Sequence, residues 1–386
     1  ICPEDWVENV LGDIYTERKE PGNEGLPLLM VSIHSGVSDG EVGEKDLPKR
    51  FKRIEDKSQY KRAVVGDLVF NMMRAWQGAI GSVRTEGMVS PAYVVAKPND
   101  MVDPLFMDYY MKTNRMVHTI HRQSYGVTDF RLRLYWESFA PIPCVLPPAR
   151  EQKKIAEILT TQDKVIELKG KLLAEKQQQK KYLMQQLLTG RKRLPGFVGK
   201  WKEDNLGALF TERVETNCEH MELLAITGTQ GVIPRSLLDL KDNSSEDKSK
   251  YLHICFGDIG YNTMRMWQGV SAYSNYEGIV SPAYTILKPK DEICAKYFSY
   301  LFKLPEIVFL FYRFSQGLVD DTRNLKYENF SKIKVKFPND ESEQEAISKV
   351  FEAVDKEIKL LQQNLVQEKQ KKKALMQLLL TGIVRV

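Results

Sequence analysis

The sequence lacks the motifs that mark the best-known catalytic sites. It contains no Gly-x-x-x-x-Gly-Lys-Ser/Thr phosphate loop, no Gly-x-Gly-x-x-Gly turn, no Gly-x-Ser-x-Gly elbow and no His-Glu-x-x-His motif. It also lacks an Asn/Asp-Pro-Pro-aromatic motif of the sort that adenine methyltransferases use. We therefore expect a protein without catalytic residues of its own.

Potential metal ligands are scarce, with five cysteines and five histidines among 386 residues. The cysteines are isolated and odd in number, which argues against a disulfide framework and against a Cys-x-x-Cys metal site. His118-x-x-His121 stands alone and has no counterpart later in the chain. We therefore expect no bound metal ion, and buried free thiols at Cys2, Cys144, Cys218, Cys255 and Cys294.

Long apolar runs are missing as well. No stretch approaches the roughly 20 apolar residues that span a bilayer, and the first residues do not resemble a signal peptide. We therefore expect a cytoplasmic protein without a membrane partner. The net charge of +5 is compatible with a nucleic-acid partner but does not require one.

What the sequence does contain is an internal duplication. Met73-Arg-Ala-Trp-Gln-Gly recurs as Met264-Arg-Met-Trp-Gln-Gly, and the following Val-Ser-Pro-Ala-Tyr block also recurs. Gly257 lies 191 residues after Gly66, and Pro289 lies 191 residues after Pro98, so this block carries no insertion. A repeat of this length predicts two similar domains rather than a solenoid.

Each copy begins with short apolar runs and turn-rich stretches and ends in a long helical stretch. Leu28–Ile33 and Ala63–Phe70 have the composition of strands, and Phe106–Thr113 that of a helix. After two prolines, residues 150–188 contain no proline and one glycine, and residues 340–381 form a similar stretch.

The predicted fold class is therefore α+β, with two similar mixed α/β domains in tandem and two long helices. The expected boundaries are 1–147 for the first domain, 148–190 for its helix, 191–195 for a basic linker, 196–339 for the second domain and 340–386 for its helix.

Both helices carry apolar residues at heptad spacing, which predicts an intramolecular coiled coil. The seam of the first helix is weaker, because Gln162, Lys169 and Lys176 occupy one of its two series. The alternative is two separate amphipathic helices, each packed on its own domain. The expected seam residues are Leu159, Ile166, Leu173 and Leu187 in the first helix, and Phe351, Ile358, Leu365 and Leu379 in the second.

Repeated polar groups are the candidates for ligand contact. Arg and Gln suit bidentate contacts to guanine and adenine, while Lys and Ser suit phosphates. Groups shared by both copies should hold DNA or contact a common base, and loops that differ should discriminate between sites. In the alternative, structural interpretation, Trp76 belongs to the core and Ser90-Pro-Ala-Tyr93 is a turn with a packed strand. The candidates are His34, Lys57, Lys61, Arg74, Trp76, Gln77, Arg122, Ser124, Arg131 and Arg133 in the first copy, and Thr229, Gln230, Lys248, Lys250, Arg265, Trp267, Gln268, Arg313, Ser315, Arg323 and Asn324 in the second.

The duplicated order of motifs resembles the specificity (S) subunit of type I restriction-modification enzymes, over essentially the whole chain. The blocks that carry the resemblance are Trp-x-x-x-x-Leu-Gly at 6–12 and 201–207, Gly-Asp at 66–67 and 257–258, the two blocks of the duplication, Pro-Pro-x-x-Glu-Gln at 147–152, Leu-Leu-Thr-Gly at 187–190 and 379–382, and Arg-Leu-Pro-Gly-Phe at 193–197.

The resemblance implies two target recognition domains, each contacting one half of a bipartite site in double-stranded DNA. It also implies two long helices that pack antiparallel, separate the domains and dock two methyltransferase (M) subunits. The chain itself would be non-catalytic and without cofactors: S-adenosylmethionine would belong to M, and ATP and Mg to partner subunits that include the restriction (R) subunits. A protein-binding coiled-coil scaffold without DNA specificity is the alternative in another functional class.

Overall fold

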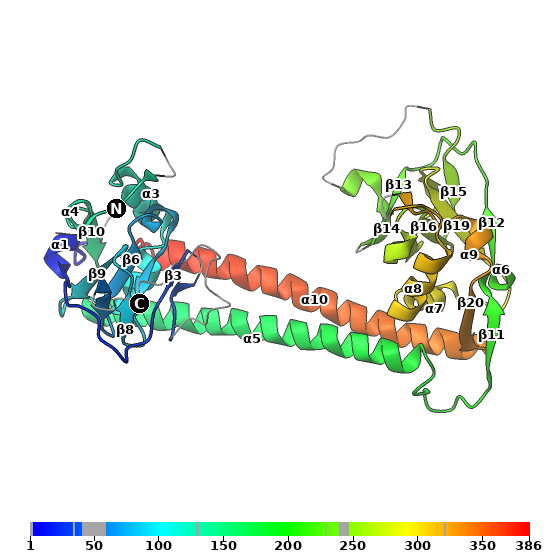
Figure 1. Cartoon of the computed structure of the whole chain (residues 1–386), viewed down its shortest axis with the longest axis horizontal. Coiled ribbons are helices and arrows are strands. Elements are labelled where there is room, and N and C mark those ends of the chain that lie inside the picture. Colours follow the sequence, from blue (N-terminus) through cyan, green and yellow to red (C-terminus); the bar gives the residue numbers. More distant parts are fainter. Residues whose placement is uncertain are drawn as a thin grey trace. The chain divides into compact units, whose positions relative to one another are not determined.

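The computed structural model describes residues 3–33, 35–40, 59–128, 131–228, 230–238, 247–319 and 322–386. It contains two compact units (Figure 1). The first unit comprises residues 1–170 and 363–386, and the second comprises residues 171–362. Each unit therefore combines one repeat with parts of both long helices.

The described part of the first unit has a four-stranded antiparallel sheet in the order β2-β9-β6-β7, with two-stranded pairs β1-β10, β3-β4 and β5-β8. The strands are β1 (Val7–Val10), β2 (Tyr15–Glu17), β3 (Val31–Ser32), β4 (Gly36–Val37), β5 (Lys61–Ala63), β6 (Leu68–Asn71), β7 (Ile80–Ser82), β8 (Gly87–Val89), β9 (Tyr93–Pro98) and β10 (Pro143–Leu146). The helices of the repeat are α1 (Leu11–Ile14), η3 (Ala75–Gln77), α2 (Pro104–Tyr110), α3 (Asn114–Arg122) and α4 (Trp136–Phe139).

The second unit repeats this topology, with the sheet order β12-β19-β16-β17 and the pairs β11-β20, β13-β14 and β15-β18 among its described residues. The strands are β11 (Trp201–Asn205), β12 (Phe210–Arg213), β13 (Leu224–Thr227), β14 (Gly231–Pro234), β15 (Leu252–Ile254), β16 (Ile259–Asn262), β17 (Ser271–Tyr273), β18 (Gly278–Val280), β19 (Tyr284–Pro289) and β20 (Lys334–Pro338). The helices are α6 (Leu206–Leu209), η5 (Arg235–Leu237), η6 (Met266–Gln268), α7 (Ala295–Leu301), α8 (Pro305–Phe314) and α9 (Tyr327–Phe330). The expected α+β class with two similar domains is confirmed.

Strand β6 is apolar on both faces because both faces are covered. Leu68 and Phe70 contribute to one core of the first unit, and Val69 between them contributes to a second core. Successive side chains of a strand point to opposite faces, so this alternation places β6 between two apolar layers. Strand β6, which directly precedes the first duplicated block, is therefore held by apolar packing on both faces.

The apolar run Ala63–Phe70 was expected as one strand, and this expectation is wrong. It forms the end of β5 and most of β6, separated by a turn in which Gly66 has φ +95°. Asp67 closes the turn: its Oδ2 accepts a hydrogen bond from the Val64 amide at 2.8 Å and one from Arg18 Nε at 2.7 Å. Gly257 and Asp258 form the same turn in the second unit, also with φ +95°. The Gly-Asp motif is therefore structural.

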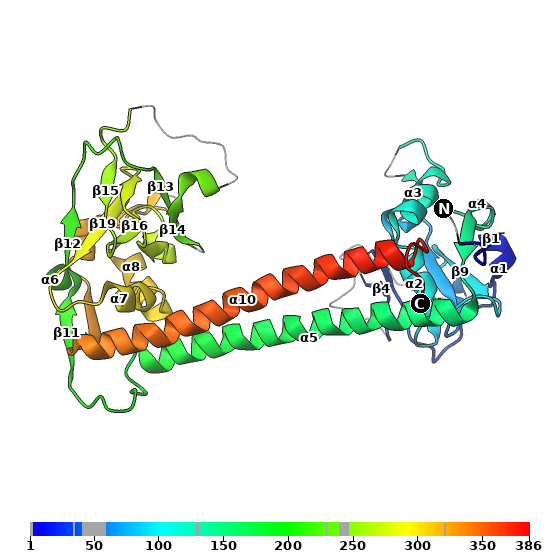
Figure 2. The same cartoon turned by 180° about the vertical axis from the view of Figure 1, so that it is seen from behind.

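The two long helices are α5 (Ala149–Leu187) and α10 (Glu341–Leu379), each of 39 residues. In the first unit the start of α5 lies beside the end of α10 (Figures 1 and 2). There Asp163 pairs with Lys372, and Lys169 with Glu368. In the second unit the end of α5 lies beside the start of α10, where Lys176 and Lys180 pair with Glu357 and Asp355. Residue numbers rise along α5 as they fall along α10 in both units, so the helices pack antiparallel, as expected.

The seam between the helices is apolar at its ends and partly polar between them. Leu159, Leu187, Phe351 and Leu379 are buried. Ile166, Leu173, Ile358 and Leu365 are half-buried. In the first unit, Glu368 accepts hydrogen bonds from Gln162 Nε2 and from Lys169 Nζ, each at 2.7 Å. The weaker seam positions of α5 thus have polar partners on α10.

The end of each helix completes the core of the other repeat. Leu187 and Leu188 lie in a core with Phe210 and Phe337 of the second repeat. Leu379 and Leu380 lie in a core with Trp6 of the first repeat. An arginine beyond each helix end then reaches a buried glutamate at the start of the other helix: Arg193 binds Glu343, and Arg385 binds Glu151. Among the described residues, no helix has the length and apolar character that crossing a membrane requires.

Candidate nucleic-acid interface

The first duplicated block forms a closed loop between β6 and β7. Asn71 Oδ1 accepts the Met73 amide at 2.9 Å, and Trp76 Nε1 donates to the Met73 carbonyl at 3.1 Å. The chain then makes the short helix η3 and ends in Gly78, which has φ +95°. A residue with a Cβ rarely adopts this conformation, which explains the glycine.

The loop of the second repeat has the same construction. Asn262 Oδ1 accepts the Met264 amide at 3.0 Å, Trp267 Nε1 donates to the Met264 carbonyl at 2.9 Å, and Gly269 has φ +78°. Arg265 has φ −128° and ψ 5°, close to the −133° and 5° of Arg74. The two copies of the loop therefore hold the arginine in the same backbone conformation.

This construction presents Arg and Gln outward and Trp inward. Arg74, Gln77, Arg265 and Gln268 are exposed in the structure. Trp76 is half-buried against the core of the first unit, with its ring 5.4 Å from that of His121. The indole N–H already binds within the loop, so the tryptophan holds the loop in shape and the neighbouring Arg and Gln are available to a ligand.

Two further candidate segments lie beside this loop. The ring contact between Trp76 and His121 places Arg122, the last residue of α3, next to the loop. The Leu134 amide donates to the Met72 carbonyl at 2.8 Å, which places the segment of Arg131 and Arg133 there too. The structure therefore brings together three predicted segments that are far apart in the sequence. We call this set the arginine face of the first domain: Arg74, Gln77, Arg122, Arg131 and Arg133, all exposed.

The second domain has an equivalent arginine face. Trp267 lies 6.1 Å from the ring of Tyr312, which precedes Arg313 in α8, and the Leu325 amide donates to the Thr263 carbonyl at 2.8 Å. Its composition differs, because Arg323 is half-buried and its guanidinium lies 4.0 Å from the centre of the Tyr312 ring. We define this face as Arg265, Gln268, Arg313, Arg323 and Asn324.

Several predicted contact residues have their polar groups engaged inside the domain. Ser124 and Ser315 are buried, and their hydroxyls donate to the Ile120 and Phe311 carbonyls at 2.8 and 2.7 Å. Lys61 Nζ donates to the Tyr93 carbonyl at 2.9 Å. Such groups stabilise the helix end and the sheet, so they do not contribute to the arginine faces.

The remaining predicted residues belong to other segments of the repeats, or fall outside the described residues. Gln230 and Lys250 are exposed, and Lys248 lies over the Tyr251 ring at 5.6 Å. His34, Lys57 and Thr229 fall on residues that the structure does not describe.

A half-buried lysine that sequence reasoning missed supports the second loop. Lys303 Nζ donates to the carbonyls of Gly269 and Ser271, at 2.6 Å each. Burial lowers the pKa of Lys303 to about 8, while the two carbonyls hold its charged form. Its counterpart 191 residues earlier is Lys112, whose pKa burial also lowers. This recurrence was the available signal in the sequence.

Comparison with known proteins adds a domain match and a shared fold. Residues 239–368 match the model described as "Type I restriction modification DNA specificity domain". The fold is similar to the HsdS subunit from Thermoanaerobacter tengcongensis, with 16% identity, a TM-score of 0.55 and coverage of 99% of this chain and 98% of that one. It is also similar to the type I restriction-modification S subunit from M. genitalium, with 14% identity, a TM-score of 0.57 and coverage of 97% and 96%.

A third similar structure is titled for complex assembly and conformational transition of the type I R-M system; identity is 15%, the TM-score is 0.56, and both chains are covered completely. The specificity-domain match and the shared tandem fold agree with the motif order found in the sequence. Over its whole length the chain is therefore similar in fold to type I restriction-modification specificity (S) subunits, and residues 239–368 match their specificity domain.

Proposed function

We propose that this chain recognises a bipartite site in double-stranded DNA, with one recognition domain for each half, at residues 1–147 and 196–339. The observation that carries the proposal is the arginine face, which occurs in both repeats. It gathers exposed arginines from three segments in the first domain, and exposed Arg265 and Arg313 beside the half-buried Arg323 in the second. Cations set on a rigid loop suit phosphates and guanine edges. The family is non-catalytic, so DNA recognition is its contribution to the complex.

Within each arginine face we assign two roles. Arg74 with Gln77, and Arg265 with Gln268, are shared by both repeats and so bind phosphate or a base common to both half-sites. The side chains that differ discriminate: Arg131 and Arg133 in the first repeat, and Arg323 and Asn324 in the second, together with the loops 34–53 and 229–248.

We further propose that α5 and α10 dock two methyltransferase (M) subunits, through which restriction (R) subunits join. The helices carry large apolar side chains that the chain itself leaves exposed, such as Leu168 at 55% and Val366 at 55%. Exposed apolar residues on otherwise polar helices suit a protein partner. In this assignment S-adenosylmethionine, ATP and Mg act in the partners.

The test of DNA recognition is a gel shift with purified M, in the presence and absence of this chain, followed by methylation of a randomised DNA library. A bipartite methylated motif that requires this chain supports the proposal. Complex formation with M but no sequence preference favours the alternative, a coiled-coil scaffold without DNA specificity.

The assignment of roles has its own test. Arg265→Ala should weaken binding about equally on all sequences and flatten its salt dependence, if Arg265 contacts phosphate. Exchange of the 229–248 loop for the loop of another S subunit should change one half of the motif, because a base contact contributes about 1 to 3 kcal/mol at one position. Relaxation of one base by Arg265→Ala, with an unchanged motif after the loop exchange, would reverse the roles.

A further inference from the structure

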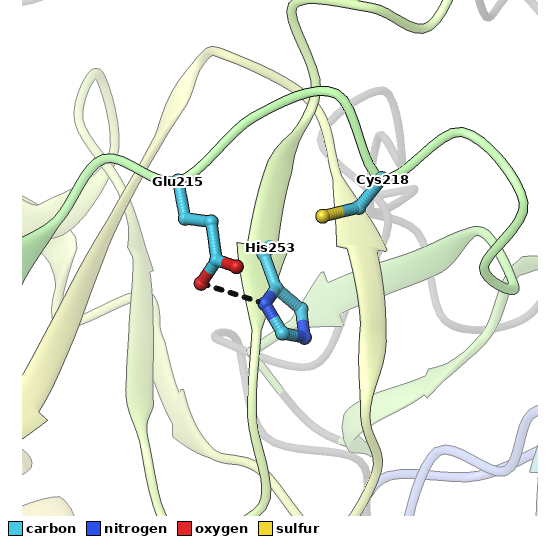
Figure 3. Close-up of side chains that lie close together, drawn as sticks. All are labelled: Glu215, Cys218 and His253. Carbon is cyan, nitrogen blue, oxygen red and sulfur yellow. Dashed lines mark hydrogen bonds and ion pairs between the residues drawn. The ribbon is translucent and has the colours of Figure 1, made fainter.

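His253 of β15 lies between two glutamates on the surface of the second domain. Its Nδ1 is 2.9 Å from Glu215 Oε2, and its Nε2 is 3.1 Å from Glu277 Oε1. The imidazole is 9% exposed, whereas the glutamates are 52% and 57% exposed. Figure 3 shows Glu215 and Cys218 on the same loop, both directed at the imidazole.

The first domain has an arginine at this position. Arg62 lies 191 residues before His253, and Arg62 binds Glu20 and Glu86 where His253 binds Glu215 and Glu277. The positions are equivalent in the backbone too. The Arg62 amide donates to the Glu20 carbonyl and the His253 amide to the Glu215 carbonyl, both at 2.9 Å.

The comparison shows that the second domain lacks the permanent charge and some of the hydrogen-bond donors that the first domain has at this position. Arginine is permanently charged and has enough donors for both carboxylates, whereas a neutral imidazole donates from one nitrogen only. The second domain also has two cysteines near His253. Cys255 stands where the first domain has Val64, and Cys218 lies within 4.8 Å of the imidazole and of Glu215. A cation bound between these donors would replace the charge of Arg62.

We propose that His253, Cys255 and Glu277 bind a Zn²⁺ ion or a similar borderline-soft divalent cation. Imidazole, thiolate and carboxylate are the ligand types that zinc uses in proteins. Glu215 then accepts a hydrogen bond from the Nδ1–H of His253, and so orients the ring that coordinates through Nε2, as carboxylates commonly do for metal-bound histidines.

The separations of the donor atoms are within about 0.2 Å of those around such an ion. His253 Nε2 lies 3.1 Å from Glu277 Oε1 and 3.6 Å from Cys255 Sγ, and Sγ lies 4.0 Å from Oε1. Donors around a tetrahedral zinc ion lie about 3.3 to 3.8 Å apart, given bonds of about 2.0 to 2.3 Å. Sγ is also 4.0 Å from Nδ1, which places it beside the ring. Binding therefore requires Cys255 to rotate toward Nε2 and to release its thiol proton to solvent.

The test is metal binding by the purified full chain, which does not depend on DNA or on M. We expect one Zn²⁺ per chain in competition with a chromophoric chelator, and a thiolate-to-cobalt charge-transfer band when Co²⁺ replaces Zn²⁺. Cys255→Val, which restores the residue of the first domain, should remove the band. It should lower the affinity by more than the roughly 10- to 100-fold that loss of an outer partner costs.

His253→Arg provides a second variant that the fold itself recommends. It restores the arrangement of Arg62 and should fold without binding metal, so that Zn²⁺ raises the melting temperature of the wild-type chain only. Cys218→Ser and Cys294→Ser are the matched thiol controls and should bind Zn²⁺ as the wild-type chain does.

Three results would overturn the proposal. They are no Zn²⁺ binding by the wild-type chain, equal binding by Cys255→Val, and loss of binding in Cys218→Ser but not in Cys255→Val. If His253→Arg does not fold, the pair Cys255→Val and Cys218→Ser still decides.

Discussion

Glu343→Ala tests how much the end of one helix contributes to the domain of the other repeat. Glu343 is 1% exposed, and its two oxygens accept Arg193 Nε at 2.5 Å and Arg193 Nη2 at 2.6 Å. Removing one partner of a buried ion pair typically costs about 3 to 5 kcal/mol. Arg193 is 26% exposed and also donates to the Gly199 carbonyl, so water and backbone compensate in part.

We therefore expect Glu343→Ala to destabilise the second unit by about 2 to 3 kcal/mol. For a unit of this size that lowers the melting temperature by roughly 4 to 12 °C. The chain has two units and need not unfold in one step, so the measurement should separate them. Hydrogen exchange followed by mass spectrometry does so, and protection should fall around residues 183–193 and 341–351 while the first unit is unchanged.

The matched control is Glu345→Ala, two residues along the same helix. Glu345 pairs with Lys349 at 3.1 Å, but their side chains are 51% and 70% exposed, so the expected cost is below about 0.5 kcal/mol. Equal effects of Glu343→Ala and Glu345→Ala would refute the reasoning. So would an equal loss of protection in both units.

Other parts of the structure give three further expectations. In the seam, Leu365→Asp places a charge at a half-buried apolar position and should lower the free energy of unfolding, measured by heat or urea, by about 2 to 4 kcal/mol. The control is Leu360→Asp, which should be nearly neutral because Leu360 is 51% exposed. Unchanged melting of both variants would show that Leu365 does not belong to the seam. The pKa of Lys303 is about 8 in the folded state against an ordinary 10.5, so the folded state binds fewer protons between these values. The free energy of unfolding of the wild-type chain relative to Lys303→Met should therefore rise from pH 8 to pH 10.5. The absence of this rise would show that the two carbonyls outweigh burial. Residues 1–195 should form a dimer and, with M, methylate a palindromic site, as light scattering and library methylation can measure; a monomer without DNA preference would exclude this.

The sequence predicted those features that repeat or follow a period. The duplication gave two similar domains because identical blocks at constant spacing fold alike, and the heptads predicted that the helices pair. The strand expected at 63–70 failed for a local reason, because one glycine with positive φ turns an apolar run into two strands. The apolar composition of this run does not distinguish two strands joined by a turn from one continuous strand, even though Val65 in the turn is 60% exposed.

Recurrence did not separate contact residues from structural ones. Arg122-x-Ser124 and Arg313-x-Ser315 recur together, yet the arginines are exposed and the serines are bonded to the preceding helix turn. Both kinds of residue repeat when a domain is duplicated. The group around His253 was missed because its members come from three separate segments, so no local spacing marks them.

Because the end of each long helix packs on the other repeat, the last residues of the second helix segment lie beside the start of the first repeat. In the first unit, Gly382 lies against Pro3 and Trp6, and Arg385 donates to Asp5 at 2.6 Å. In the second unit the equivalent Gly190 lies against Trp201, and there residues 191–200 join the two continuously. A peptide that joins residue 386 to residue 3 would copy that linker, and the chain could then be opened between 194 and 200. Circular permutants of this kind should keep both units, because each helix end makes equivalent contacts with the start of the other repeat.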